Sequence, residues 1–287
     1  MPEVVYLNGQ FVESEKAVIS IHDRGFLFGD AVYEAIRSYS GRLWAMERHL
    51  RRLRRSLQEI DMGYVDVNTI AEVIERAYRR SEFADASVYL QITRGVQPRR
   101  HAYTHKLAPT VLVTVRDITP MLARINWEGE SVMTAPDVRW KRCDIKSTNL
   151  LPNVLAHTAA IEGGAHEAVL YDAEGYVTEA ASMTVFCVEN GCVLTTPLGE
   201  EILPSITRQF VVEMAADEGI PLREERVSLE RFRKAGEVFL ASTSHEVCPV
   251  TKVDGRPVGD GKAGPVTRRL MEGFKTRVAA GDDGVRA

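Results

Sequence analysis

The stretch Val138-Arg-Trp-Lys-Arg-Cys-Asp-Ile-Lys-Ser-Thr-Asn-Leu-Leu-Pro-Asn153 places one lysine, Lys146, between two different structural patterns. Residues 131–136 before it have strand composition, and residues 153–162 after it have apolar side chains at helical spacing. A lysine at such a junction is partly removed from water, and the nearby Lys141 and Arg142 also oppose its protonation. Both effects favour a neutral amine that can form a Schiff base with a carbonyl compound. Taken alone, the same pattern also fits a surface lysine in a basic loop.

Length and composition indicate a globular protein with enough chain for two domains. The sequence has 287 residues, of which 45% are hydrophobic and 26% charged. There are 36 Lys and Arg residues against 40 Asp and Glu, a balance that argues against a general binder of nucleic acid or anionic membranes. The four cysteines show no metal-site spacing and are interpreted as reduced thiols, and the N-terminus lacks the pattern of a signal peptide. We therefore expect a cytoplasmic protein with no membrane span.

The first part of the chain predicts an α+β domain. Asn8-Gly9 lies between apolar runs and predicts a hairpin, and Ser40-Gly41 predicts a second turn after a strand over 31–39. Apolar spacing predicts helices over 47–61 and 68–83, the second with Asn68 as N-cap. Strands over 87–93 and 110–115 follow, separated by a polar loop. The predicted domain covers residues 1–118, and residues 119–128 form the predicted linker.

The second part, residues 129–287, is richer in predicted strands. Short β runs are expected over 168–172, 184–188, 192–196 and 237–241, and helices over 205–217 and 264–278. The last nine residues are small and polar and are expected to fray.

The segment Arg142-Cys-Asp-Ile-Lys-Ser-Thr-Asn-Leu-Leu151 resembles the lysine segment of class IV aminotransferases, which are fold-type IV pyridoxal phosphate enzymes. Further matches follow in order from Tyr6 to the region of Phe274, and they are most similar to the D-amino-acid aminotransferases. The resemblance implies an α+β, two-domain fold with a smaller N-terminal α/β domain and a larger β-rich C-terminal domain that binds pyridoxal 5′-phosphate. It also implies a homodimer, and that Lys146 holds the cofactor and moves the substrate proton.

The cofactor needs a carboxylate at its pyridine nitrogen and an anion site for its phosphate. Tyr176-Val-Thr-Glu-Ala-Ala-Ser-Met-Thr-Val-Phe186 is similar to the family's Thr-Glu-Gly-Ser motif, which implies that Glu179 and Ser182 contact the cofactor, although Ala180 and Met183-Thr184 depart from the motif. The helix start after Leu203 supplies free amides and a hydroxyl for a phosphate. By resemblance, the phosphate and ring contacts come from Arg52, Leu203, Ile206, Thr207 and Thr243. Each of these residues also has an ordinary structural interpretation, as a helix cap, a turn residue or a solvated side chain.

The loop Arg94-Gly-Val-Gln-Pro-Arg-Arg-His101 resembles the loop of D-amino-acid aminotransferases that binds the substrate carboxylate. By resemblance, Arg99 and His101 bind that carboxylate together with Tyr33, and the loop reaches the site of the neighbouring subunit. A guanidinium fork and two further hydrogen-bond donors suit a carboxylate. Arg100 departs from the pattern and would favour acidic substrates.

The sequence therefore predicts ping-pong transamination between D-amino acids and 2-oxo acids, for example D-alanine with 2-oxoglutarate to give pyruvate and D-glutamate. The alternatives within the fold are a branched-chain L-amino-acid aminotransferase, an (R)-amine transaminase and an aminodeoxychorismate lyase. The Arg99 and His101 pair argues against the first two of these alternatives. A different alternative is nucleic-acid binding by the basic run over 48–55, but its leucines recur at helical spacing, which favours a helix with a solvated basic face.

Overall fold

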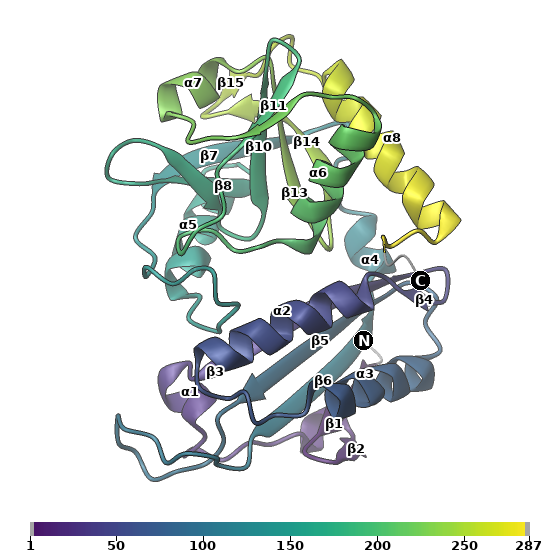
Figure 1. The fold of residues 1–287 in the computed structure, drawn as a ribbon, viewed down its shortest axis with the longest axis vertical. Helices are drawn as coiled ribbons and strands as arrows, with labels where there is room; N and C mark the ends of the chain where they lie inside the picture. The colour runs from purple at the N-terminus through teal and green to yellow at the C-terminus, as the bar shows by residue number, and fades with distance from the viewer. Residues whose placement is uncertain (1–2, 285–287) are drawn as a thin grey trace. The chain divides into compact units, whose positions relative to one another are not determined.

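The computed structural model describes residues 3–284, and these divide into two compact units (Figure 1). The first unit contains residues up to Ala123 together with Ile145–Asn149, and the second contains Arg124–Asp144 and Leu150–Gly284. The short segment around Lys146 thus belongs with the first unit although it lies within the second unit in sequence. Of the tail that was expected to fray, the last three residues lie outside the described part of the chain.

The first unit is a six-stranded sheet in the order β2-β1-β6-β5-β3-β4. All of its strand pairs are antiparallel. The strands are β1 (Glu3–Leu7), β2 (Gln10–Val12), β3 (Ala31–Tyr39), β4 (Arg42–Leu43), β5 (Ala86–Thr93) and β6 (Thr110–Asp117). The helical segments are η1 (Ser14–Lys16), α1 (Arg24–Phe28), α2 (Met46–Glu59), α3 (Val67–Ser81) and α4 (Thr119–Leu122), the last of which lies within the residues predicted as linker.

Local sequence explains most of these elements. Asn8 and Gly9 both have positive φ, 46° and 98°, as a tight hairpin turn requires, and this confirms the first predicted hairpin. Helix α3 begins at Val67, and its N-cap is Asp66, whose carboxylate accepts a hydrogen bond from the amide of Asn68. The prediction of Asn68 as N-cap was therefore wrong, because the charged side chain two residues earlier already takes that role.

Helices α2 and α3 pack against the sheet and enclose the core of the first unit. Leu50, Leu53 and Leu57 of α2 are buried there, and they meet Val32 and Ile36 from one face of β3. The basic run is thus one side of a core helix. The prediction that the arginines of residues 48–55 form a solvated face is correct for only some of them, since Arg48 and Arg52 are buried.

The second unit is built on a nine-stranded sheet in the order β12-β11-β10-β13-β14-β7-β8-β9, with β15 paired to β14. The strands are β7 (Glu130–Pro136), β8 (Glu167–Tyr171), β9 (Val177–Ala180), β10 (Thr184–Glu189), β11 (Cys192–Thr195), β12 (Leu222–Glu224), β13 (Glu237–Ser242), β14 (Glu246–Val253) and β15 (Arg256–Pro257). The helices are α5 (Leu151–Glu162), α6 (Ile206–Asp217), α7 (Leu229–Lys234) and α8 (Pro265–Ala280).

Strands β7 and β8 are parallel neighbours, and the chain between them contains the Lys146 segment and α5. The lysine segment therefore follows the carboxyl end of a parallel strand, the edge at which α/β proteins commonly bind ligands. Helix α5 packs against β7 and β8. Its apolar side chains Leu151, Val154, Leu155 and Ile161 are nevertheless exposed. Across the described chain, no helix is long and apolar enough to span a membrane.

Candidate active site

Lys146 is held beside strand β3 of the first unit. Its carbonyl accepts a hydrogen bond from the amide of Tyr33 at 3.0 Å, and its own amide donates to the hydroxyl of Ser56 on α2 at 3.2 Å. Ser147 forms a bridge with Val32, so the segment runs along this edge of β3 as an added strand would. The Lys146 Nζ lies 4.2 Å from the centroid of the Tyr33 ring, within the range of amine–aromatic contacts. Main-chain contacts thus fix the backbone that presents this amine.

The two cations expected to act on Lys146 are each paired with a carboxylate in the second unit. Lys141 lies 2.5 Å from Glu201, and Arg142 lies 3.0 Å from Asp144. Each of the two cations thus has a carboxylate partner, and their expected effect on Lys146 stays a prediction.

A buried network of charged residues lies next to Tyr33. Glu34 points to the face of β3 that packs on α2, and Arg52 forks onto its carboxylate at 2.8 and 2.7 Å. His49 Nδ1 lies 2.7 Å from the same carboxylate. Burial alone would raise the pKa of Glu34, but Arg52 and His49 outweigh it and lower that pKa to about 2.

Burial also lowers the pKa of His49, so its imidazole is neutral at pH 7 and donates to Glu34. The bidentate contact with Glu34 holds Arg52 in one orientation inside the first unit.

In the second unit, Glu179 is a buried carboxylate with a partner that the sequence did not indicate. Arg139 bonds to Glu179 through Nη1 and to Asp137 through Nε and Nη2, the latter two at 2.9 and 2.6 Å. The amide of Leu203 donates to the other oxygen of Glu179 at 3.2 Å. Burial raises the pKa of Glu179, and the Arg139 guanidinium opposes that rise. Arg139 was missed because no local pattern links it to a carboxylate that lies 40 positions away.

The first turn of helix α6 contains two of the candidate phosphate residues. Ser205 is its N-cap and accepts a hydrogen bond from the amide of Arg208 at 3.2 Å. Ile206 and Thr207 occupy the first turn, where the amides of any helix lack partners within the helix. Helix α6 packs against β13, which ends at Ser242, and Thr243 follows in the turn. The first-turn amides of α6 can donate to an anion, and the part of Thr243 in such a site stays a prediction.

Ser182 belongs to a separate hydrogen-bonded group. Its hydroxyl bonds to the fully buried carboxylate of Glu167, whose other oxygen lies 3.0 Å from His157 Nδ1. The bond to Glu167 raises the pKa of His157. Ser182 is thus anchored by a carboxylate that sequence reasoning did not identify.

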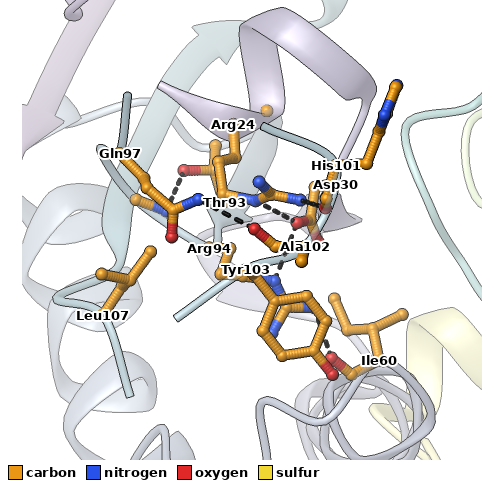
Figure 2. Close-up of polar contacts among 12 residues, drawn as sticks. Arg24, Asp30, Ile60, Thr93, Arg94, Gln97, His101, Ala102, Tyr103 and Leu107 are labelled. Atoms are coloured by element: carbon orange, nitrogen blue, oxygen red, sulfur yellow. Dashed lines mark hydrogen bonds and ion pairs between the residues drawn. The ribbon is translucent and has the colours of Figure 1, made fainter. Parts of the chain in front are cut away.

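Of the three residues predicted to bind the substrate carboxylate, two pack on the same aromatic ring and the third packs on a different one. Arg99 and His101 both pack on Phe28, with Arg99 Cζ 5.4 Å and the His101 ring 5.7 Å from the Phe28 ring centroid. Tyr33 instead packs on Tyr89 at 5.8 Å. Both Arg99 and His101 are exposed, and the His101 ring points away from the polar network beneath the loop (Figure 2).

The chemistry of these groups fits pyridoxal phosphate. The first unit offers an amine, Lys146, over an aromatic ring, and the second offers a buried carboxylate, Glu179, held by a charged partner. The first-turn amides of α6 suit a phosphate dianion. Among the described residues, no cluster of His, Cys, Asp or Glu is suited to hold a metal ion. The residues present therefore match what an organic cofactor with an aldehyde, a pyridine nitrogen and a phosphate requires.

Comparison with known proteins assigns the chain to a family. The model of the family described as Amino-transferase class IV matches residues 31–253. A D-alanine aminotransferase from Staphylococcus haemolyticus is 41% identical over 273 residues, which cover 94% of this chain and 96% of that protein. A D-alanine aminotransferase from Listeria monocytogenes is 39% identical over 274 residues, 94% of each chain.

Solved structures agree with this assignment. A branched-chain amino acid aminotransferase from Thermoproteus uzoniensis, solved with norvaline, superposes with a TM-score of 0.85 at 26% identity, covering 97% of this chain and 95% of that one. The predicted α+β fold of the fold-type IV class is therefore confirmed.

Proposed function

This chain belongs to the class IV aminotransferases, and on that premise we propose that it transfers amino groups between D-amino acids and 2-oxo acids with pyridoxal 5′-phosphate. The observation that carries the choice of substrate is the likeness over nearly the whole chain to proteins named D-alanine aminotransferase, at 39–41% identity. The Arg99 and His101 pair on the exposed loop supports it, since a guanidinium beside an imidazole suits the carboxylate of an amino acid.

The residues divide the work by their chemistry. When bound, pyridoxal phosphate supplies a ring that accepts the electrons released when the amino acid loses its α-proton. Lys146 holds the cofactor through Nζ and then takes the α-proton as general base and returns it as general acid. Glu179, whose carboxylate binds Arg139, holds the proton on the ring nitrogen. The cofactor phosphate is bound by Arg52, Ile206, Thr207 and Thr243. Ser182 also contacts the cofactor, and Leu203 packs on its ring. The substrate carboxylate is bound by Tyr33, Arg99 and His101.

The visible absorption spectrum of the purified protein with pyridoxal phosphate tests both cofactor and substrate. We expect a yellow band that D-alanine bleaches and L-leucine does not. Bleaching by L-leucine alone would move the assignment to branched-chain L-amino acids.

Lys146→Ala is expected to abolish turnover, because the variant loses the amine that both holds the cofactor and moves the proton. Arg79→Gln, on the exposed face of α3, is the control and should retain wild-type turnover. A Lys146→Ala protein that kept substantial turnover would refute the proposed mechanism.

We also propose that the protein is a homodimer. Supporting this, Leu151 and Leu155 on α5 are 68% and 62% exposed, and Val154 and Ile161 on the same helix are also exposed, an apolar set of the kind that a partner covers. Leu155→Glu is expected to shift the mass measured by light scattering from dimer to monomer, whereas Leu198→Glu, at an exposed leucine outside α5, should not. A wild-type monomer at micromolar concentration would contradict the proposal.

Two further assignments complete the proposal. The four cysteines are free thiols: Cys143, Cys187, Cys192 and Cys248. The cytoplasm keeps thiols reduced, which supports a cytoplasmic location, and cell fractionation tests it.

Arg100 donates to the Thr104 hydroxyl at 2.6 Å within the substrate loop. Its charge on that loop supports a preference for acidic D-amino acids, which the KM of D-glutamate relative to D-alanine would measure.

A further inference from the structure

Arg24, the first residue of α1, is buried beneath the loop that carries Arg99 and His101. Its Nη1 donates to the carbonyl of Arg100 at 2.8 Å. Its Nη2 donates to the carbonyl of His101, the next residue, at 3.0 Å (Figure 2). Its Nε donates to Asp30 at 2.7 Å. Arg24 is only 4% exposed. Charge-assisted bonds from a buried guanidinium thus fix two successive peptide groups of the loop.

A second arginine supports the base of the same loop. Arg94 Nε donates to the Asp30 oxygen that Arg24 also binds, at 2.8 Å, and its Nη2 donates to the carbonyl of Ile60 at 2.6 Å. Its guanidinium carbon lies 3.7 Å from the centroid of the Tyr103 ring. One carboxylate, that of Asp30, therefore lies between two buried guanidinium groups: Arg94 at the start of the loop, and Arg24, which also binds the carbonyl of His101 (Figure 2).

The loop is also closed by its own hydrogen bonds. Gln97 Nε2 donates to the carbonyl of Ala102 at 3.0 Å, and Gln97 Oε1 accepts from the amide of Thr104 at 2.7 Å. The main chain between these points is thus held from below by Arg24 and across the loop by Gln97. The side chains of Arg99 and His101 extend from a backbone that is already ordered.

We propose that Arg24 is a positioning residue that sets the specificity for the substrate carboxylate by ordering the main chain at Arg100 and His101. The inference rests on the proposed function, in which Arg99 and His101 bind that carboxylate. A loop ordered before binding loses less conformational entropy when the substrate binds, so Arg24 lowers the KM of carboxylate substrates without touching them. Its loss should leave the bound cofactor and the proton transfer by Lys146 unchanged.

The test compares Arg24→Gln and Arg24→Lys with the control Arg79→Gln, whose exposed arginine pairs with Glu75 on α3. For Arg24→Gln we expect the KM of D-alanine to rise about tenfold or more, as the loss of two charge-assisted bonds implies. The kcat and the cofactor absorption band should stay near those of the control. Arg24→Lys retains the charge beside Asp30 but cannot fork onto two carbonyls, so its KM should rise as well.

A second readout does not depend on catalysis. Arg99 and Arg100 are exposed trypsin sites on the loop, and mass spectrometry of brief digests measures how fast they are cleaved. Cleavage there should be faster in both Arg24 variants than in Arg79→Gln. If trypsin cleaves the loop in Arg24→Gln and Arg24→Lys no faster than in Arg79→Gln, Arg24 does not order the loop and the proposal is overturned.

A double-variant comparison connects the two readouts. If Arg24 acts through the loop, adding Arg24→Gln to Arg99→Gln should raise the KM little further, because the carboxylate contact is already lost. Additive effects on KM would overturn the proposal. Failure of the proposed function would look different: the wild-type protein would show no cofactor band and no turnover of D-alanine, while the trypsin result would still report on the loop.

Discussion

Glu34→Gln would test the buried network that lies beside Tyr33. The substitution keeps the size and shape of the side chain but removes the charge that faces the Arg52 guanidinium. Glu34 and Arg52 are 1% and 8% exposed, so water cannot replace the lost carboxylate. Arg52 would then be a buried cation without a carboxylate to fork onto. Glutamine has one acceptor oxygen, so its NH2 group would face either Arg52 Nε or the pair of donors Arg52 Nη2 and His49 Nδ1.

The size of the effect follows from the pKa of Glu34. Its value of about 2, against an ordinary 4.5, corresponds to about 3 kcal/mol at neutral pH, since each pKa unit is worth about 1.36 kcal/mol. Removing one partner of a buried ion pair typically costs about 3–5 kcal/mol, which agrees. We therefore expect Glu34→Gln to lower the free energy of unfolding of the first unit by about 3 kcal/mol at pH 7.

The pH dependence gives a second, independent expectation. Because the folded-state pKa is depressed, the stabilisation by Glu34 is complete above about pH 4.5 and is lost as the pH falls towards 2. At pH 3 the difference between wild type and Glu34→Gln should therefore shrink to about half its value at pH 7. A difference that stays constant or grows on acidification would contradict the assignment of the effect to Glu34.

Urea unfolding followed by tryptophan fluorescence measures this effect for the first unit alone. The background Trp127→Phe/Trp140→Phe leaves Trp44, which is buried in the first unit, as the only tryptophan. Measurements are made without pyridoxal phosphate, since a ligand would add its own binding energy. Glu72→Gln, at an exposed position of α3, is the control and should change stability by less than about 0.5 kcal/mol. A loss below about 1 kcal/mol for Glu34→Gln at pH 7 would refute the reasoning.

Two further predictions concern the second unit. Arg139→Met removes the cation that opposes the raised pKa of Glu179, so the affinity for pyridoxal phosphate should fall about tenfold or more in an absorbance titration. Arg226→Met, at an arginine with exposed ion pairs, is the control, and equal affinities in the two variants would count against this role. His157 has a raised pKa because it bonds to Glu167, so their pairing stabilises the fold below pH 6.5 and this contribution is lost as the pH rises through the folded-state pKa. The stability difference between wild type and His157→Gln should accordingly decrease from pH 6 to pH 9 in urea titrations, and an increase would be inconsistent with it.

Much of the secondary structure was predictable from neighbouring residues. The Asn8-Gly9 turn, the amphipathic spacing of α2 and α3, and the strands on either side of the 94–109 loop depend on turn chemistry and on side-chain period. The lysine segment was also recognisable, because its residues are consecutive. Its assignment to the first unit was not, since that depends on hydrogen bonds with the Tyr33 amide and the Ser56 hydroxyl, which are distant in sequence.

The sequence by itself thus determined the local elements and the family resemblance, and it predicted which residues carry the chemistry of an aminotransferase. The tertiary structure alone decided the partners of those residues: Arg52 with Glu34, 18 positions apart, Arg139 with Glu179, 40 apart, and Arg24 with the carbonyl of Arg100, 76 apart. The physical reason is that a buried charge needs a partner of opposite sign or a carbonyl within hydrogen-bonding distance, and any of several residues of suitable type could supply it. Packing selects the actual partner in each case. Helix α2 packs on β3, the chain after β7 packs against β9, and α1 lies under the loop that carries Arg99 and His101.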